Sequence, residues 1–241
     1  MFIRTMERRL IKTHLSKKPL PSGLAVSMGM ILLCTLTSLA YWNIPSVSTY
    51  LAANQDLVLN HYHIWRLLTS TLVHGDMGHL LSNSYMLGIL SYFVFGYFGW
   101  TVYPFAIFIL SAFVNLFTLM AMPESIFLIG ASGMVYCLAG FWLTLYIFIE
   151  RQRSFTQRFV RSFGVALVTL FPTSLEPQTS YKAHAIGFLV GLLFAIYYFL
   201  THKTQIRNSE KWQIIFDEED SYPFPQEPLP ENKGTDPLHW N

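Results

Sequence analysis

The sequence carries few charged residues, and those it has are unevenly distributed. Asp, Glu, Lys and Arg make up 12% of its 241 residues, whereas soluble domains usually contain about 25%. None of them occurs in the stretches 19–55, 77–123, 125–149 and 183–202. Because a membrane-spanning helix needs roughly 20 mostly apolar residues, this scarcity of charge excludes a soluble globular protein and a disordered chain.

The uncharged stretches, the low net charge and the lack of alternating polar residues exclude further classes of protein. The long uncharged stretches also exclude a secreted disulfide scaffold. The two cysteines, Cys34 and Cys137, both lie in apolar stretches and say nothing about the redox compartment. The net charge is only +2 and no basic patch is interleaved with aromatic residues, so no nucleic-acid partner is expected. The apolar stretches also lack the two-residue alternation of outer-membrane strands. The sequence therefore predicts an all-α protein that crosses the membrane several times.

The apolar stretches predict six spans, at about 22–42, 76–97, 101–121, 132–149, 161–174 and 183–201. A turn rich in glycine and aromatic residues, at 96–100, separates the second span from the third. The fifth span is the shortest, and an apolar run of that length could equally be an interfacial or re-entrant segment.

The basic residues predict the topology. Fourteen of the sixteen Lys and Arg residues lie before residue 19, between the fourth span and the start of the fifth, or after the sixth. With six crossings these three clusters share one side of the membrane, which the positive-inside rule makes cytoplasmic. We therefore expect cytoplasmic termini, a basic tail at 1–21 and a six-helix bundle at 22–201. Residues 43–75 would form an extracytoplasmic segment that lies partly among the lipid headgroups.

Residues 202–241 differ sharply from the rest of the chain. They contain eight acidic residues and five prolines. Such a composition predicts a mostly disordered cytoplasmic tail. A partner-binding segment around residues 212–216 is the alternative.

Three groups of polar and small residues lie inside the predicted spans, where polar side chains are costly and point to function. The groups are His79 with Asn83 (preceded by His74), Gly130-Ala131-Ser132-Gly133, and His184 followed by Gly187 and Gly191. Each group alone also has a structural explanation. Polar side chains commonly bond between membrane helices, glycines permit close helix packing, and a histidine can be a satisfied core residue.

Considered together, the three groups suggest acyl-transfer chemistry. The predicted topology puts Ser132, His184 and His79 near the outer ends of three spans, with Asn83 about 6 Å deeper. A serine hydroxyl becomes a nucleophile when a base accepts its proton, and the neutral imidazole of His184 is a suitable base. His79, the Asn83 amide and the backbone N–H of Ser132 could stabilise the oxyanion that forms.

The spans contain no acidic residue that could orient His184. We therefore infer a dyad in which Tyr136, one turn after Ser132, packs on the imidazole. Gly187 and Gly191 would let the sixth helix approach the fourth closely. No H-E-x-x-H motif or other metal-ligand spacing occurs in the spans, so neither a metal nor a cofactor is expected.

This set of residues resembles the rhomboid family of intramembrane serine proteases. The resemblance covers roughly residues 23–201 and includes Trp65-Arg66 in the first loop. It implies that Ser132 is the nucleophile, that His184 is the general base, and that His79 and Asn83 stabilise the oxyanion. It also implies that the fifth helix is a mobile side gate for substrate. The supporting residues would be His74, Gly130, Gly133, Tyr136, Gly187 and Gly191.

One departure from the family pattern concerns the second span. Many rhomboids carry a glycine and then a glutamate late in this span, where the present chain has Ser91 and Phe95. The difference affects the scaffold and leaves open a divergent branch, such as the rhombosortase-like enzymes that process C-terminal sorting anchors. Inactive rhomboid-like proteins lack the serine or the histidine, and both are present here.

These features predict a serine endopeptidase of the bacterial cytoplasmic membrane. It would cleave single-spanning membrane proteins at or near the outer leaflet through an acyl-enzyme, so its partners would be these substrates and the lipid bilayer. One alternative is a catalytically silent rhomboid-like protein that binds membrane clients. Another is a small transporter or proton channel that uses His79 and His184. A channel needs a polar path through the membrane, and Asn115 is the main polar residue available in the inner halves of the spans.

Overall fold

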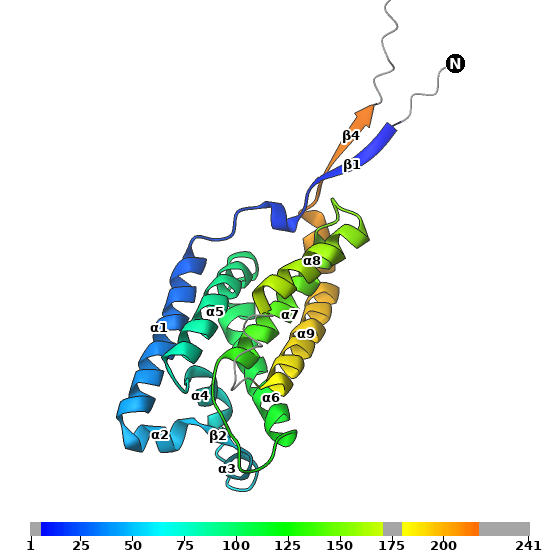
Figure 1. Ribbon diagram of the computed structural model, residues 1–241. Coiled ribbons are helices and arrows are strands. Elements are labelled where there is room, and N and C mark those ends of the chain that lie inside the picture. Colours follow the sequence, from blue (N-terminus) through cyan, green and yellow to red (C-terminus); the bar gives the residue numbers. More distant parts are fainter. Residues whose placement is uncertain (1–5, 171–179, 217–241) are drawn as a thin grey trace, which may run out of the picture. The chain divides into compact units, whose positions relative to one another are not determined.

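The computed structural model describes residues 6–170 and 180–216, which fold mainly into helices (Figure 1). The long helices are α1 (Ser22–Asn43), α5 (Met77–Phe98), α6 (Ile107–Met120), α7 (Ser132–Ile149), α8 (Phe155–Leu170) and α9 (Tyr181–Asn208). The short ones are η1 (His14–Ser16), α2 (Pro45–Leu51), α3 (Gln55–Leu59), α4 (Arg66–Leu72) and the wide-turned η2 (Thr101–Ala106). Strands β1 (Met6–Lys12) and β4 (Lys211–Phe216) form one two-stranded sheet, and β2 (Ala53–Asn54) and β3 (Phe127–Leu128) form another.

Four helices of the described chain are long and apolar enough to cross a membrane. They are α1, the segment Thr101–Met120 that combines η2 with α6 across a kink at Tyr103, helix α7, and helix α9. The other two predicted spans correspond to α5, which agrees closely with the predicted 76–97, and to α8. The start predicted for the fifth span, at 161, is wrong by about two turns, because the amphipathic residues from Phe155 onward are already helical. Residues 171–174 of that prediction lie outside the described residues.

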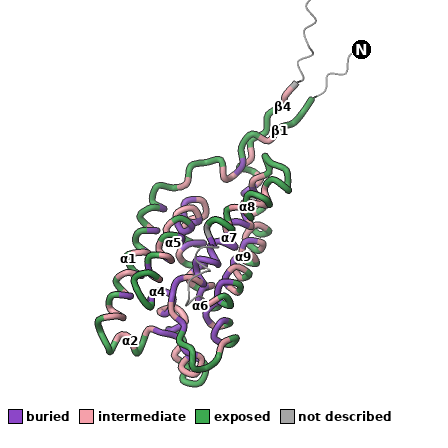
Figure 2. The backbone as a smooth tube through the Cα atoms, in the orientation of Figure 1, coloured by how far each residue is buried: buried purple, intermediate pink, exposed green. Residues whose placement is uncertain are grey.

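Helix α7 occupies the centre of the bundle, and most of its length is buried, whereas α1 and α8 leave much of their surface exposed (Figure 2). Helix α9 packs against it through glycines. A Cβ atom at Gly187 would lie 2.5 Å from the carbonyl oxygen of Gly133, and one at Gly191 would overlap the carbonyl oxygen of Cys137. The predicted close approach of these two helices is therefore confirmed, and it requires residues without side chains.

The chain between α1 and α5 is held together by a buried arginine and is joined to the rest of the bundle by backbone pairing. The buried guanidinium of Arg66 donates to the carbonyl oxygens of Ala52 and Thr49, both at 2.7 Å. Strand β2 pairs antiparallel with β3, so Asn54 lies opposite Phe127. This pairing joins the α1–α5 connection to the segment that leads into α7.

Residues 6–9 and 212–216 belong to a second compact unit. Here the guanidinium carbon of Arg8 lies 4.6 Å from the ring centroid of Trp212. The regular structure therefore extends beyond the boundary predicted at residue 202, because α9 continues to Asn208 and β4 pairs with β1. Pairing with a strand from the other end of the chain satisfies backbone groups that composition alone would assign to a disordered tail. Residues 217–241 lie outside the described part.

Candidate active site

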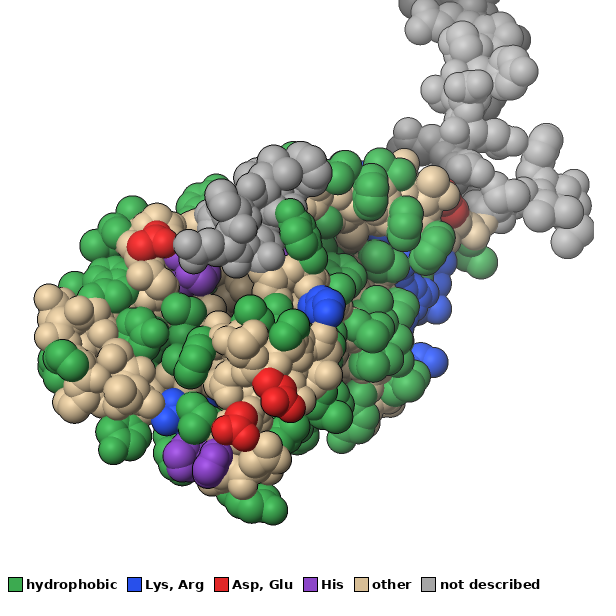
Figure 3. Space-filling view, turned by 60° about the horizontal axis from the view of Figure 1, so that its bottom comes forward, with side chains coloured by type: hydrophobic (Ala, Val, Ile, Leu, Met, Phe, Trp, Pro, Cys, Tyr) green, Lys and Arg blue, Asp and Glu red, His purple; other side chains and the backbone are tan. Residues whose placement is uncertain are grey.

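A cavity of about 500 Å³ opens among α5, the segment before α7, α7 itself and the start of α9. It is lined by the side chains predicted for catalysis, namely Ser132, His184, His79 and Asn83, and by Tyr136. Figure 3 looks toward this end of the helical bundle, where histidine and acidic side chains stand among hydrophobic ones. Residues more than 100 positions apart in the sequence thus meet at one site.

Ser132 is the first residue of α7, and the loop before it is held by two hydrogen bonds that its backbone N–H groups donate. The N–H of Gly130 donates to the carbonyl oxygen of Ser70 at 2.8 Å, and that of Ala131 donates to Nε2 of His74 at 3.3 Å. Gly130 has φ +118°, a conformation that side chains other than hydrogen rarely allow. The turn therefore fixes the half-buried Ser132 at the N-terminus of α7.

His184 lies in the first turn of α9, where Ser180 caps the helix by accepting a hydrogen bond from the N–H of Ala183 at 3.2 Å. Its ring stacks on that of Tyr136, with centroids 3.8 Å apart and planes at 14°. The Tyr136 hydroxyl in turn donates to the carbonyl oxygen of Leu170 in α8 at 2.9 Å. The stacking predicted from the sequence is thus present. Within the described ranges, the buried Nδ1 of His184 has no hydrogen-bond partner.

His79 and Asn83 follow the start of α5, which Asp76 caps by accepting from the N–H of His79 at 2.9 Å. The Asn83 amide donates one N–H to the carbonyl oxygen of His79 at 3.0 Å. A Cβ at Gly130 would lie 2.7 Å from Cε1 of His79, so the imidazole rests directly on the turn before Ser132. The hydrogen bond that Asn83 donates runs within its own helix, unlike the interhelical bond of the purely structural interpretation.

His74 connects α1 to the turn before α7. Its Nε2 accepts a hydrogen bond from the N–H of Ala131, and its Nδ1 lies 3.2 Å from Oγ of Ser38. Because Nε2 accepts, the ring proton of the neutral imidazole lies on Nδ1. The indole of Trp42 donates to its carbonyl oxygen at 2.8 Å. Burial, and next the charge of His79, lowers the pKa of His74 to about 3. A neutral His74 is what allows Nε2 to accept from the turn.

Sequence patterns could not identify Ser38 and Trp42 as partners of His74, because a hydroxyl and an indole within an apolar helix form no motif. Asn115 was expected to be the main polar residue in the inner halves of the spans, and the structure places its amide against α4. Its amide donates to the carbonyl oxygen of Leu67 and to the hydroxyls of Ser70 and Thr71, at 2.9, 3.2 and 3.0 Å. Its polar group therefore braces two helices.

The departure in the second span also has a structural counterpart. The Ser91 hydroxyl donates to that of Ser27 in α1 at 2.8 Å, and Phe95 is buried with its ring edge toward Trp100. These contacts hold α5 against α1 and against the turn that follows it. Across residues 6–170 and 180–216, no group of three or more His, Cys, Asp or Glu side chains is arranged to hold a metal ion.

A family model for the Rhomboid domain matches residues 61–201. The match covers more than half of the sequence and all the cavity residues named above, and the chain belongs to the rhomboid family. With its apolar helices, it is an integral membrane protein. No curated protein matches the sequence. The rhomboid family contains both serine proteases and inactive homologues, so the activity of a member depends on its site residues.

Proposed function

We propose that the protein is an intramembrane serine endopeptidase with a Ser132–His184 dyad. The observation that carries the proposal is the shared cavity, where a serine at a helix start and a buried histidine from another helix meet two possible oxyanion donors, His79 and Asn83. Chance packing of polar residues would not favour one nucleophile, one base and two donors around the same space.

The reaction follows from these groups. His184 accepts the proton of Ser132 as the hydroxyl attacks a peptide carbonyl. The backbone N–H of Ser132, the second N–H of Asn83 and the ring of His79 stabilise the negative oxygen that develops. His184 then gives the proton to the departing amine, leaving an acyl-enzyme that water hydrolyses by the same steps. The turn at Gly130 is buried beneath the His79 ring, so a substrate backbone would reach Ser132 through the cavity that this serine lines.

The proposed setting is the bacterial cytoplasmic membrane, with six crossings and cytoplasmic termini. Helices α1, α5, η2 with α6, α7, α8 and α9 supply the crossings, and the cavity then faces the extracytoplasmic leaflet. The concentration of Lys and Arg at the opposite end supports this orientation. Substrates would be single-spanning proteins whose helix is easily unwound near the scissile bond, because a helical carbonyl is shielded from attack.

The test combines turnover with active-site labelling. Purified full-length protein should cleave a quenched transmembrane peptide and react with a fluorophosphonate probe, and both signals should disappear in Ser132→Ala. Protein that is folded and monodisperse yet neither cleaves a panel of such peptides nor reacts with the probe would favour the client-binding alternative.

A further inference from the structure

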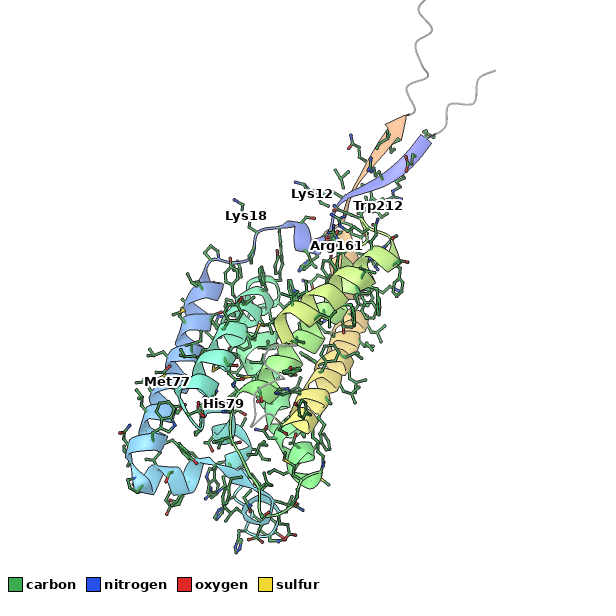
Figure 4. The ribbon with its side chains drawn as sticks, in the orientation of Figure 1. Lys12, Lys18, Met77, His79, Arg161 and Trp212 are labelled. Atoms are coloured by element: carbon green, nitrogen blue, oxygen red, sulfur yellow. The ribbon has the colours of Figure 1, made fainter. Side chains whose placement is uncertain are left out.

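We propose that the outward face of α8 binds one anionic phospholipid, with Arg161 holding the phosphate. Figure 4 shows Arg161 on α8 toward the end of the bundle where Lys12 and Lys18 lie, away from His79. The proposed site is thus separate from the cavity. Helix α8 contributes no residue to the proposed catalytic reaction.

Helix α8 is the least enclosed of the long helices. Of its residues whose burial is described, only Ser162 and Leu170 are buried. At 100° per residue these two belong to the side that packs on α7. Arg161 points the opposite way and is exposed, although it lies six residues inside the helix. An exposed guanidinium on a lipid-facing helix is costly unless it reaches the headgroups or finds an anion.

The geometry favours the headgroup region. Side chains on a helix lean toward its N-terminus, so the guanidinium of Arg161 extends toward the start of α8, where Arg153 and Arg158 add positive charge. The acidic groups nearby are engaged elsewhere. Glu210 pairs with Arg207 and Arg151, and Glu150 accepts from a threonine hydroxyl. In the described residues no carboxylate pairs with Arg161 or Arg153.

The same face offers a path for an acyl chain. Val165 and Val168 follow Arg161 at helical spacings of four and seven residues, and they are 49% and 77% exposed. Beside them a Cβ at Gly164 would meet no atom within 4 Å, so the helix surface has open space there for an acyl chain. A planar fork that matches a phosphate, followed by an apolar strip, fits a phospholipid. The surplus of basic groups favours an anionic headgroup over a zwitterionic one.

Native mass spectrometry of the detergent-solubilised full-length protein tests this, with phosphatidylglycerol and phosphatidylcholine titrated separately. We expect one phosphatidylglycerol to bind more tightly than phosphatidylcholine. Arg161→Gln should weaken it at least about tenfold, the range of a lost charge-assisted hydrogen bond. The matched control Lys18→Gln removes the same charge from the same end of the bundle and should change affinity by less than about twofold, because the contact is local.

Two further arms complete the experiment. Gly164→Leu keeps every charge but fills the acyl path, so it should also weaken binding. Inorganic phosphate should not displace the lipid, because it cannot use the apolar strip. The proposal is overturned if Arg161→Gln and Lys18→Gln weaken binding equally, if Gly164→Leu has no effect, if phosphatidylcholine binds as well, or if phosphate displaces the lipid. Circular dichroism of each variant checks that the helices remain intact, and Arg161→Lys replaces Arg161→Gln should the latter lose them.

Discussion

The rings of Tyr136 and His184 lie face to face, with centroids 3.8 Å apart. This contact fixes the plane of an imidazole whose Nδ1 is buried without a hydrogen-bond partner in the described structure. In a serine–histidine–acid triad, a carboxylate performs this orienting role through a hydrogen bond. In the dyad that we propose, the Tyr136 ring, on the same helix as Ser132, would take over this role.

The stacking can be separated from the hydroxyl by two substitutions. Tyr136→Phe keeps the ring and removes the hydroxyl that bonds to Leu170, so turnover should fall by less than about tenfold, in line with one lost hydrogen bond. Tyr136→Leu removes the stack and should lower kcat more strongly than it changes KM. The measurement is steady-state cleavage of a transmembrane peptide. Equal losses in both variants would assign the role to the hydroxyl instead.

The dyad itself predicts non-additive substitutions. Ser132→Ala and His184→Ala should each reduce cleavage to background while the protein remains folded. Because the two residues act as one unit, the double variant should be no worse than either single one. The check is product formation over long incubations with thermal unfolding in parallel, and substantial cleavage by Ser132→Ala would refute the assignment.

Asn83, which lines the cavity, and Asn115, which bonds to α4, provide a matched pair. Loss of one oxyanion donor typically costs about 100- to 1000-fold, so Asn83→Ala should lower kcat by about 100-fold or somewhat less, since other donors remain. His79→Ala should cost more than Asn83→Ala, because its ring also rests on the turn before Ser132.

Asn115→Ala is the control for these variants. It removes three hydrogen bonds between α6 and α4, so it should reduce stability by about 1–3 kcal/mol with a much smaller effect on kcat. Comparison of kcat with the thermal unfolding temperature distinguishes the two roles. A purely structural role for Asn83 would make it behave like Asn115.

Helix contact at α7 and α9 predicts opposite outcomes for two glycines. At Gly191 an added methyl group would overlap the carbonyl oxygen of Cys137, whereas at Gly29 in α1 it would meet nothing within 4 Å. Gly191→Ala should therefore separate the helices, move His184 from Ser132 and lower both stability and turnover. Gly29→Ala should leave turnover unchanged and slightly stabilise its helix. Thermal unfolding and cleavage rates measured together would reveal any departure from this ranking.

His74 predicts a pH dependence of stability, and it lies in the α4–α5 connection outside the spanning helices. Its pKa is lowered by burial to about 3, whereas histidine in an unfolded chain titrates near 6.5. Between these values the unfolded state binds a proton that the folded state lacks. Its contribution to the unfolding free energy should be constant above pH 6.5. It should fall on acidification by up to about 1.4 kcal/mol per unit.

His74→Gln provides the comparison for this prediction, since glutamine keeps polar atoms but does not titrate. The stability difference between the wild type and this variant should shrink from pH 7.5 to pH 5 in detergent. Parallel pH profiles for the two proteins would contradict the argument.

The sequence predicted the helices where charge and glycine mark both ends. Helix α7 begins at Ser132 and ends at Ile149 as predicted, because a glycine-rich turn precedes it and Glu150 follows. The cavity residues could also be predicted, since helical rise places residues from different spans at a common depth. Helix α8 was placed too late, because its first two turns carry arginines that a search for uncharged runs excludes.

Contacts between distant segments were not predictable in this way. Strand β4 forms only by pairing with β1 near the other end of the chain, and two residues are too few for β2 or β3 to show a period. The brace from Asn115 to α4 depends on which face of α6 meets the loop. Such details depend on three-dimensional packing, which a one-dimensional pattern does not contain.

The pairing of β2 with β3 makes the position of one cavity wall independent of the side chains that line it. Backbone hydrogen bonds opposite Asn54 fix where the wall formed by residues 127–128 stands, and these bonds do not depend on side-chain identity. The Phe127 side chain lines the cavity and is 59% exposed, so it can be exchanged without moving the wall. The selectivity of this pocket can therefore diverge through single substitutions while its framework stays constant.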